Sequence, residues 1–236
     1  MTNPHPTPTC KPLSEANSVL VKRIIKAHPR QFVSAVVTGT RGSGKSMYCY
    51  KTMARTYQIL FDLSEEESYK MALDHMIFSM EELAALIYKN VKTRYVTPVI
   101  TLDDASVHFF SHRYFTDMKK VTAIHGVFDT IRVAVTGLLM NCPNRKALLS
   151  FLRNYDDLKI KVHRADGHWG RYARAYRFNY LPDEVKKNIT VPFQDNFSCY
   201  VPDEYFELYM DKRFKILGDQ NELMMKQLEI GKEVLD

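Results

Sequence analysis

Residues Gly39 to Ser46 have the types and the spacing needed to bind the phosphates of a nucleotide. The segment reads Gly-Thr-Arg-Gly-Ser-Gly-Lys-Ser and matches the pattern GxxxxGK[ST], in which glycines let successive backbone amides turn toward phosphate oxygens. A helical pattern follows it, so a helix dipole adds to the attraction. We predict a phosphate site here, with a chance match in a glycine-rich loop as the alternative. The predicted nucleotide-binding residues are Gly39, Thr40, Arg41, Gly42, Ser43, Gly44, Lys45, Ser46 and Met47.

Two residues of this segment have distinct chemical tasks in the pattern. Lys45 reaches the β and γ phosphates and is a predicted catalytic residue, while the Ser46 hydroxyl ligates Mg²⁺. Asp103 follows the apolar run Pro98–Leu102, where a second carboxylate on the metal side is expected. Ser46 and Asp103 are therefore the predicted metal ligands, Asp103 directly or through water, and ATP and Mg²⁺ are the predicted cofactors. A surface acidic turn is the alternative for Asp103.

Asp104 and Asn141 are predicted to act near the terminal phosphate. Asp104 stands where many ATPases with this order of motifs carry a glutamate that polarises the attacking water. An aspartate is one methylene shorter, so it serves as the base only if the water lies closer, and slow hydrolysis would follow. A second metal-side carboxylate or a cap is the alternative for Asp104. Asn141 closes the apolar run Thr136–Met140, where it either senses the γ phosphate or only forms a turn.

An arginine from a neighbouring subunit often completes such a site by stabilising charge in the transition state. Arg113, Arg145 and Arg153 are available, and we take Arg153 as the catalytic candidate. A solvated surface charge is the alternative for each of them. The hypothesis implies a homo-oligomer, for which a hexameric ring is one form.

A second group of residues, between Leu158 and Tyr180, suits a nucleic acid. Two extended stretches surround a turn, which predicts a hairpin, and aromatic residues are interleaved with its cations. Cations that neutralise phosphates beside aromatics that stack on bases are typical of a nucleic-acid surface, so DNA is a predicted partner. A solvated edge that discourages aggregation is the alternative, and alternation implies that one face of the hairpin is packed. The predicted nucleic-acid contacts are Lys161, Arg164, Arg171, Arg174 and Arg177.

The elements that must position these residues alternate between strand and helix. This pattern predicts crossover units and a central, mainly parallel sheet covered on both faces. The expected fold class is α/β, a three-layer P-loop NTPase sandwich with a C-terminal β-hairpin and helices. Residues 1–13 are predicted as a flexible arm, 14–157 as the ATPase core, and 158–236 as an extension that completes the same domain. The predicted strands are Phe32–Thr38, Met76–Phe78, Pro98–Leu102, Thr136–Met140, Leu158–Arg164 and Arg171–Tyr180, and the predicted helices are Ser14–His28, Lys45–Leu60, two that start at Ser64 and Ser79, Asp117–Val135, Asn144–Arg153, Asp203–Met210 and Asp219–Val234.

Composition narrows the class of protein. A net charge of +6 and a pI near 9.0 are compatible with a polyanionic partner but do not require one. No stretch reaches the about 18 consecutive apolar residues of a membrane span, and the N-terminal residues do not resemble a signal peptide. The four cysteines form no CxxC pair, which suggests neither a zinc site nor a disulfide scaffold. We therefore expect an intracellular protein without a membrane span.

Together, the glycine-rich segment, the Asp103-Asp104 pair and the stretch Thr136–Pro143 resemble the P-loop ATPases of archaeal viruses and plasmids. These are similar to replication-initiator-type AAA+ proteins and are carried by spindle-shaped viruses of hot-acid archaea. The resemblance covers Val33 to Arg153, and a weaker similarity extends to the hairpin and to Phe197–Tyr209. Asp104 departs from the usual glutamate, and the hairpin stands where an AAA+ protein carries a helical lid. A core extended by strands looks more like the RecA, FtsK and HerA ATPases, or the filamentous-phage assembly ATPases.

Three functions follow from this resemblance and these residues. The first is an oligomeric ATPase that acts on DNA in the replication or maintenance of a viral or plasmid genome. The second is a motor for virion assembly, DNA packaging or conjugation. The third is a nucleotide-gated oligomerisation switch that hydrolyses ATP slowly.

Overall fold

The computed structural model describes residues 18–103, 118–143, 158–165, 167–180 and 187–227. The chain divides into two compact units, Met1–Tyr200 and Val201–Asp236. The second unit holds helix α8 (Asp203–Gln227), a single helix where the sequence pattern predicts two. Gly218 lies within α8, and one interior glycine costs a helix only about 1 kcal/mol. No helix in the described part of the chain is both long and apolar enough to cross a membrane.

The first unit is built on a mixed sheet with the strand order β2-β3-β4-β1-β5-β6-β7. The strands from β2 to β5 pair in parallel, while β5, β6 and β7 pair antiparallel. This confirms the predicted α/β class with a mainly parallel central sheet. The strands are β1 (Val33–Thr38), β2 (Met76–Ile77), β3 (Thr97–Leu102), β4 (Val135–Asn141), β5 (Leu158–Arg164), β6 (Gly170–Tyr180) and β7 (Lys187–Ser198).

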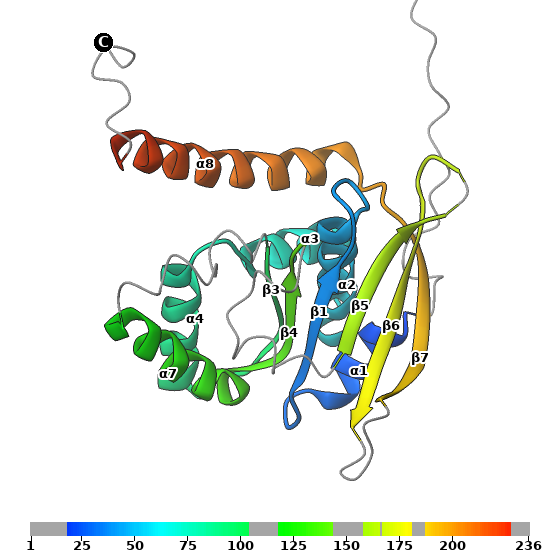
Figure 1. The fold of residues 1–236 in the computed structure, drawn as a ribbon, viewed down its shortest axis with the longest axis horizontal. Helices are drawn as coiled ribbons and strands as arrows, with labels where there is room; N and C mark the ends of the chain where they lie inside the picture. Colours follow the sequence, from blue (N-terminus) through cyan, green and yellow to red (C-terminus); the bar gives the residue numbers. More distant parts are fainter. Residues whose placement is uncertain (1–17, 104–117, 144–157, 166, 181–186, 228–236) are drawn as a thin grey trace, which may run out of the picture. The chain divides into compact units, whose positions relative to one another are not determined.

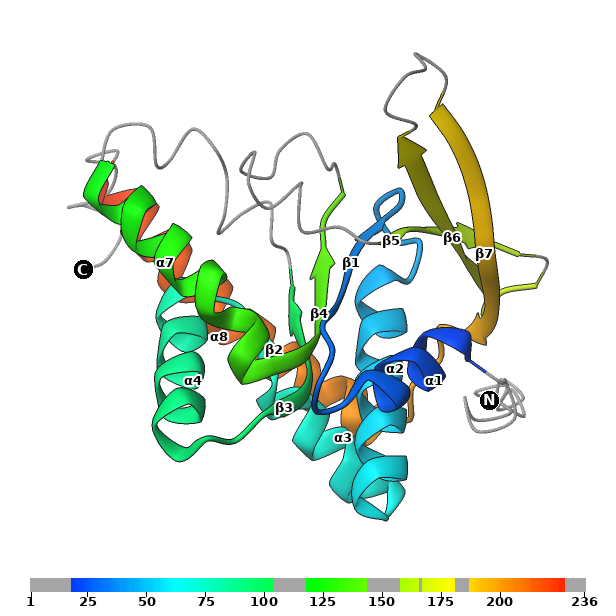
Figure 2. The same cartoon turned by 90° about the horizontal axis from the view of Figure 1, so that it is seen from below.

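Helices cover both faces of the parallel part of the sheet (Figures 1 and 2). Alternate residues of β3 point to opposite faces: Ile100 packs in a core with α4 and α7, while the Thr101 hydroxyl contacts Met53 Sδ of α2 at 2.8 Å. This alternation explains why every residue of β3 is buried, as expected for a strand between two helical layers. The helices of this unit are α1 (Val19–Ala27), α2 (Lys45–Phe61), α3 (Glu65–Asp74), α4 (Met80–Thr93) and α7 (Met118–Ala134).

Helices α3 and α4 start after the two predicted serines, Ser64 and Ser79, each of which has a glutamate three residues later and can form a capping box. At Ser64 both halves form, since its hydroxyl accepts from the Glu67 amide and the Glu67 carboxylate accepts from the Ser64 amide. At Ser79 only the first half forms, because the Glu82 carboxylate accepts instead from the Phe78 amide at 2.8 Å. Each helix start is therefore satisfied by its own sequence.

Strands β5, β6 and β7 form an antiparallel wing, and β7 is missing from the sequence prediction. Pro192 and the polar residues around it argue against a strand, but a proline is tolerated at the edge of a sheet, where its missing N–H is not needed. β7 is that edge strand. One face of the wing is buried through Ala173, Ala175 and Phe193. The wing extends the sheet beyond β1, on the side opposite β3.

A buried carboxylate fastens the wing to two helices. Asp195 of β7 is 3% exposed and accepts from the Ser18 hydroxyl at 2.8 Å, the Val19 amide at 2.8 Å and the Tyr48 hydroxyl at 2.9 Å. Ser18 is the N-cap of α1, so Asp195 satisfies donors at the start of that helix. Burial, followed by the Asp195 carboxylate, raises the pKa of the Tyr48 phenol well above its usual range, which keeps this hydroxyl a donor.

We predict that Asp195→Ala lowers the free energy of unfolding by about 3 kcal/mol, because several buried donors lose their acceptor at once. Tyr48→Phe is the matched control and should cost only about 1 kcal/mol, since it removes one donor and leaves the helix cap intact. Urea denaturation of both variants measures the difference. Equal losses would mean that the cap of α1 contributes nothing.

Candidate functional site

The carboxyl ends of β1, β3 and β4 meet at one edge of the sheet. Val37 of β1 pairs with Asn141 of β4, and Leu102 of β3 pairs with Met140, so the three strands end at nearly the same level. β1 has β4 on one side and β5 on the other, and ligands of open α/β sheets bind at such a reversal of strand order. The segment Gly39–Ser46, here called the phosphate loop, leaves β1 at this point and enters α2.

Two glycines of the phosphate loop are required by its conformation. A Cβ on Gly39 would lie 2.7 Å from the Val162 carbonyl oxygen of β5, which leaves no room for a side chain. Gly44 has φ 93°, a left-handed conformation that disfavours other residues, and a Cβ there would lie 3.1 Å from Cys199 Cβ. The spacing of the motif therefore reflects close packing of the loop against the wing as well as room for phosphates.

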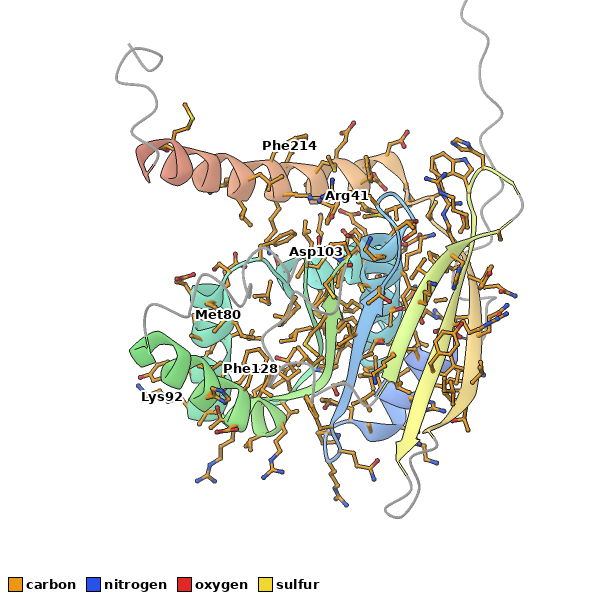
Figure 3. All side chains as sticks on the ribbon, in the orientation of Figure 1. Arg41, Met80, Lys92, Asp103, Phe128 and Phe214 are labelled. Carbon is orange, nitrogen blue, oxygen red and sulfur yellow. The ribbon has the colours of Figure 1, made fainter. Side chains whose placement is uncertain are left out.

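The side chains of the loop divide between solvent and protein. Arg41 is exposed (Figure 3). Lys45 is half-buried, and its Nζ donates to the Thr40 carbonyl at 3.0 Å. This bond holds the Lys45 ammonium at the loop, where a phosphate would meet it. Ser43 is buried, and Met47 is buried in the first turn of α2. Because Lys45 begins α2, its backbone stands at the positive end of a helix of 17 residues.

Ser46, Asp103 and Asn141 come together beside the loop. The Ser46 hydroxyl donates to Asp103 Oδ1 at 3.0 Å, and the Asn141 amide nitrogen donates to Ser46 Oγ at 2.8 Å and to Asp103 Oδ1. Asp103 is fully buried and Asn141 is 1% exposed. The sequence predictions for these residues thus fall in one cluster, although the residues come from different segments.

This cluster fits a magnesium ion. A serine hydroxyl and a carboxylate are the hard oxygen donors that Mg²⁺ prefers, and a small number of protein oxygens suffices because phosphates and waters complete its shell. Asn141 Oδ1 is buried without a hydrogen-bond partner among the described residues, so the cluster has an acceptor in excess. Ser46 and Asp103 would hold the ion, and the Asn141 amide would keep their oxygens in position.

Cys49, one turn further along α2, is fully buried beside this cluster. Burial, followed by the negative charge of Asp103, raises the pKa of its thiol well above the usual range. A thiol with a raised pKa is a poor nucleophile. Asp104, Arg113, Arg145 and Arg153 lie outside the described residues, and their predicted roles stay predictions.

Arg171 lies at the phosphate loop, a position that the sequence prediction misses. Its side chain is 9% exposed, its Nε donates to the Ser43 carbonyl at 3.1 Å, and its Nη1 donates to the His168 and Gly170 carbonyls at 3.1 and 2.6 Å. A guanidinium engaged with these oxygens braces the loop and does not face solvent. Arg171 alternates along β6 with Ala173 and Ala175, two small apolar residues. This alternation is the signal that could have assigned Arg171 to the buried face of the wing.

The other predicted nucleic-acid residues lie nearer to solvent. Arg164 is exposed, and its Nη2 would lie 3.4 Å from a Cβ on Gly42, so it stands at the rim of the phosphate loop. Lys161 and Arg174 pair across β5 and β6, and Arg177 is exposed beyond an irregularity in β6. Lys161 and Arg174 belong to what we call the outer face of the wing: Lys159, Lys161, His163, Tyr172, Arg174, Tyr176, Gln194 and Asn196.

Aromatic and basic side chains contact one another on the outer face. His163 stacks on Tyr172 with ring centroids 4.8 Å apart, and the Arg174 guanidinium lies 5.5 Å from the centre of the same tyrosine ring. Arg174 also donates to Gln194 Oε1 from Nε and Nη2, at 3.0 and 2.8 Å. Burial, then the charges of Lys161 and Arg174, lowers the pKa of His163. The positive charge of this face at neutral pH therefore comes from lysine and arginine.

No known family model matches this sequence. The chain is 23% identical over 221 residues to uncharacterized protein B-251 of Sulfolobus spindle-shape virus 1, an alignment that covers 91% of this chain and 84% of B-251. It is 30% identical over 101 residues to one subunit of the ATP-dependent helicase/nuclease of Pediococcus pentosaceus, which covers 37% of this chain and 8% of that protein. The first relative agrees with the predicted resemblance to proteins of spindle-shaped viruses, but its name states no activity.

Two solved structures are similar in fold, each with a TM-score of 0.42 and 11% identity. They are the RadB recombinase, where the match covers 70% of this chain and 86% of that one, and the N-terminal domain of zonular occludens toxin from Neisseria meningitidis, where it covers 69% and 94%. At such values these likenesses carry no functional argument. The P-loop fold of this chain is evident from its own strand order and phosphate loop.

Proposed function

We propose that this protein is a Mg²⁺-dependent ATPase that acts on DNA in the replication or maintenance of a viral or plasmid genome. The observation that carries the ATPase is the 3.0 Å contact between Ser46 Oγ and Asp103 Oδ1 beside the phosphate loop. This contact joins a hydroxyl at the start of α2 to a carboxylate at the end of β3. A phosphate loop and a buried carboxylate in that relation suit the binding of a triphosphate with its metal ion.

Each residue of the site has a task in this proposal. The loop amides and Lys45 bind the phosphates, and Lys45 offsets the charge that develops on the transferred phosphoryl group. Bound Mg²⁺ would neutralise charge on the phosphate oxygens, and Ser46 and Asp103 would hold it. Asn141 would orient Ser46 and Asp103 through its amide nitrogen. Asp104 is the proposed base for the attacking water, and its short side chain favours slow turnover.

Release of phosphate from ATP, with and without Mg²⁺, tests the ATPase directly. We expect hydrolysis that requires the ion, at a rate that Asp104→Glu increases if the longer carboxylate reaches the water. Tight binding of ATP with no turnover in either protein would instead support the nucleotide-gated switch. Absence of ATP binding would exclude both functions.

The outer face of the wing supports the proposed action on DNA. The described residues of β5, β6 and β7 include a single acid, Asp195, and it is buried on the opposite face. The outer face thus presents Lys159, Lys161 and Arg174 with no carboxylate from these strands among them. Exposed cations beside tyrosine rings provide phosphate contacts and surfaces for stacking bases. A single strand, whose bases are free to stack, suits this arrangement best.

We predict that Lys161→Ala combined with Arg174→Ala weakens binding of a single-stranded oligonucleotide about tenfold and lowers the slope of log affinity against log salt by about 1. Lys89→Ala with Lys92→Ala is the matched control, because both lysines are exposed on α4 and carry the same total charge. Fluorescence anisotropy over a range of salt concentrations measures both effects. Equal weakening in the two double variants would indicate a net-charge effect and no site on the wing.

We further propose that the protein acts inside the cell as a homo-oligomer, in which Arg153 of one subunit completes the site of the next. A ring is the form that would allow every subunit to do so, and six subunits are one such number. Mass measurement in solution, with and without ATP and Mg²⁺, tests this proposal. A monomer under both conditions would exclude it.

A further inference from the structure

An aromatic cluster lies at the turn between β5 and β6. His168 and Trp169 have ring centroids 4.7 Å apart at 90°, and Trp169 and Tyr200 have centroids 5.6 Å apart at 72°. The Trp169 side chain is 37% exposed, whereas Tyr48, Tyr50 and Tyr57 of α2 are completely buried. The core therefore does not account for the indole. We call these three residues, His168, Trp169 and Tyr200, the aromatic corner.

Two independent contacts fix the aromatic corner beside the phosphate loop. The guanidinium of Arg171 donates to both the His168 carbonyl and the Ser43 carbonyl of the loop, each at 3.1 Å. The Trp169 carbonyl accepts from the Cys199 amide at 2.9 Å, and Cys199 Cβ would lie 3.1 Å from a Cβ on Gly44. The corner and the loop thus have Arg171 and Cys199 as common neighbours.

The direction of a bound nucleotide follows from the sheet order. The metal-side residues stand at the ends of β3 and β4, so the terminal phosphate of a triphosphate on the loop faces that side of β1. The ribose and base of such a nucleotide would then extend to the other side, toward β5 and β6. Because β5 runs parallel to β1, the turn after β5 lies at the same end of the sheet as the phosphate loop (Figure 1). His168 and Trp169 of the aromatic corner are on that turn, and Tyr200 packs against Trp169.

We propose that the aromatic corner binds the base of the nucleotide whose phosphates lie on the phosphate loop, with Trp169 as the main stacking surface. The inference rests on the proposed function. It adds where the part of the ligand other than its phosphates binds, and it gives the chemical class of that part, a flat heteroaromatic base. Stacking on an aromatic side chain suits this class because every base has a π face. Arg171 holds the corner and the loop in a fixed relation, so both halves of the ligand meet a preformed site.

Trp169 is the single tryptophan of the chain, so intrinsic fluorescence reports on this position alone. We expect ATP with Mg²⁺ to change the tryptophan emission in a saturable way. Calorimetry should show that Trp169→Ala binds ATP about tenfold more weakly, because one base stack is lost. The same variant should bind inorganic tripolyphosphate with the affinity of the unchanged protein. Trp169→Phe should restore most of the ATP affinity. Tyr88→Ala is the matched control, because Tyr88 is an exposed aromatic residue of α4, and it should change the affinity for neither ligand.

The comparison of the two ligands decides the proposal. Equal weakening of ATP and tripolyphosphate in Trp169→Ala would mean that the indole only supports the loop, and no weakening of either would mean that it does not touch the base. Both results overturn the base site and leave the ATPase standing. If the unchanged protein binds neither ligand, the proposed function itself fails. If single-stranded oligonucleotide changes the emission and ATP does not, the corner stacks on bases of nucleic acid and the proposal is wrong.

Discussion

Lys45→Ala will reduce ATP hydrolysis by at least a factor of about 10² to 10³, the usual effect of removing one preorganised group that stabilises charge in the transition state. Lys45 begins α2 and its Nζ is held at the loop by the Thr40 carbonyl, 3.0 Å away. Alanine keeps the helix start and removes the side chain beyond Cβ, and with it the ammonium. The lost activity is therefore a loss of charge at the phosphates and not a loss of the loop itself.

The measurement is steady-state phosphate release at saturating Mg²⁺, together with the affinity for ATP. Lys89→Ala serves as the control, since Lys89 is an exposed lysine in the middle of α4. Lys45 is only half-buried, so we expect the midpoint of urea unfolding of Lys45→Ala to stay close to that of the unchanged protein. Full hydrolysis by the folded variant would refute the phosphate site, and with it every proposal that depends on nucleotide.

Asp103→Asn should remove the dependence of hydrolysis on Mg²⁺ and reduce the rate by about 10³ or more, because the metal ion supplies several kcal/mol of charge stabilisation. Asp103 is fully buried and accepts from Ser46 and Asn141. Asparagine has nearly the same shape but no charge, so it cannot attract a divalent cation as a carboxylate does. The substitution thus separates the charge of Asp103 from its packing.

Titration of Mg²⁺ at fixed ATP concentration, with turnover and tryptophan emission as separate readouts, distinguishes loss of metal from loss of nucleotide. We expect Asp103→Asn to bind ATP in the absence of the ion as the unchanged protein does, and to gain little when Mg²⁺ is added. Asp74→Asn is the control, because Asp74 is an exposed aspartate at the end of α3. An unchanged magnesium dependence in Asp103→Asn would assign the metal to other residues.

The predicted roles of Asp103 and Asn141 depended on where strands end, and the structure places these two residues in contact with each other. Buried parallel strands have short, nearly all-apolar sequences, so their first polar residue marks the catalytic edge of the sheet. Asn141 could not be separated from an ordinary turn residue by that rule. Its amide contacts with Ser46 and Asp103 required β4 to lie next to β1, which the chain order alone does not state.

The wing shows how an identical residue type acquires different tasks. Arg171 and Arg174 are close in sequence and both belonged to the predicted basic hairpin, yet Arg171 is bound to the loop carbonyl of Ser43 and Arg174 lies on the outer face with Gln194. The alternation of a strand separates them, but which face is covered depends on α1 and α2. The proposed role of Trp169 likewise depends on a contact with Cys199, a residue 30 positions away.

By itself, the sequence determined the phosphate loop, the start of α2 and the alternation of strands and helices, because these depend on local geometry and on residues adjacent in the chain. Tertiary structure alone decided the strand order, the edge strand β7, the fastening of α1 by Asp195 and the neighbours of the phosphate loop. These features are contacts between distant segments, and their free energy comes from burying groups that no short segment can bury alone. The phosphate loop can therefore be predicted from the sequence, while the base site proposed beside it depends on residues that only the folded chain brings together.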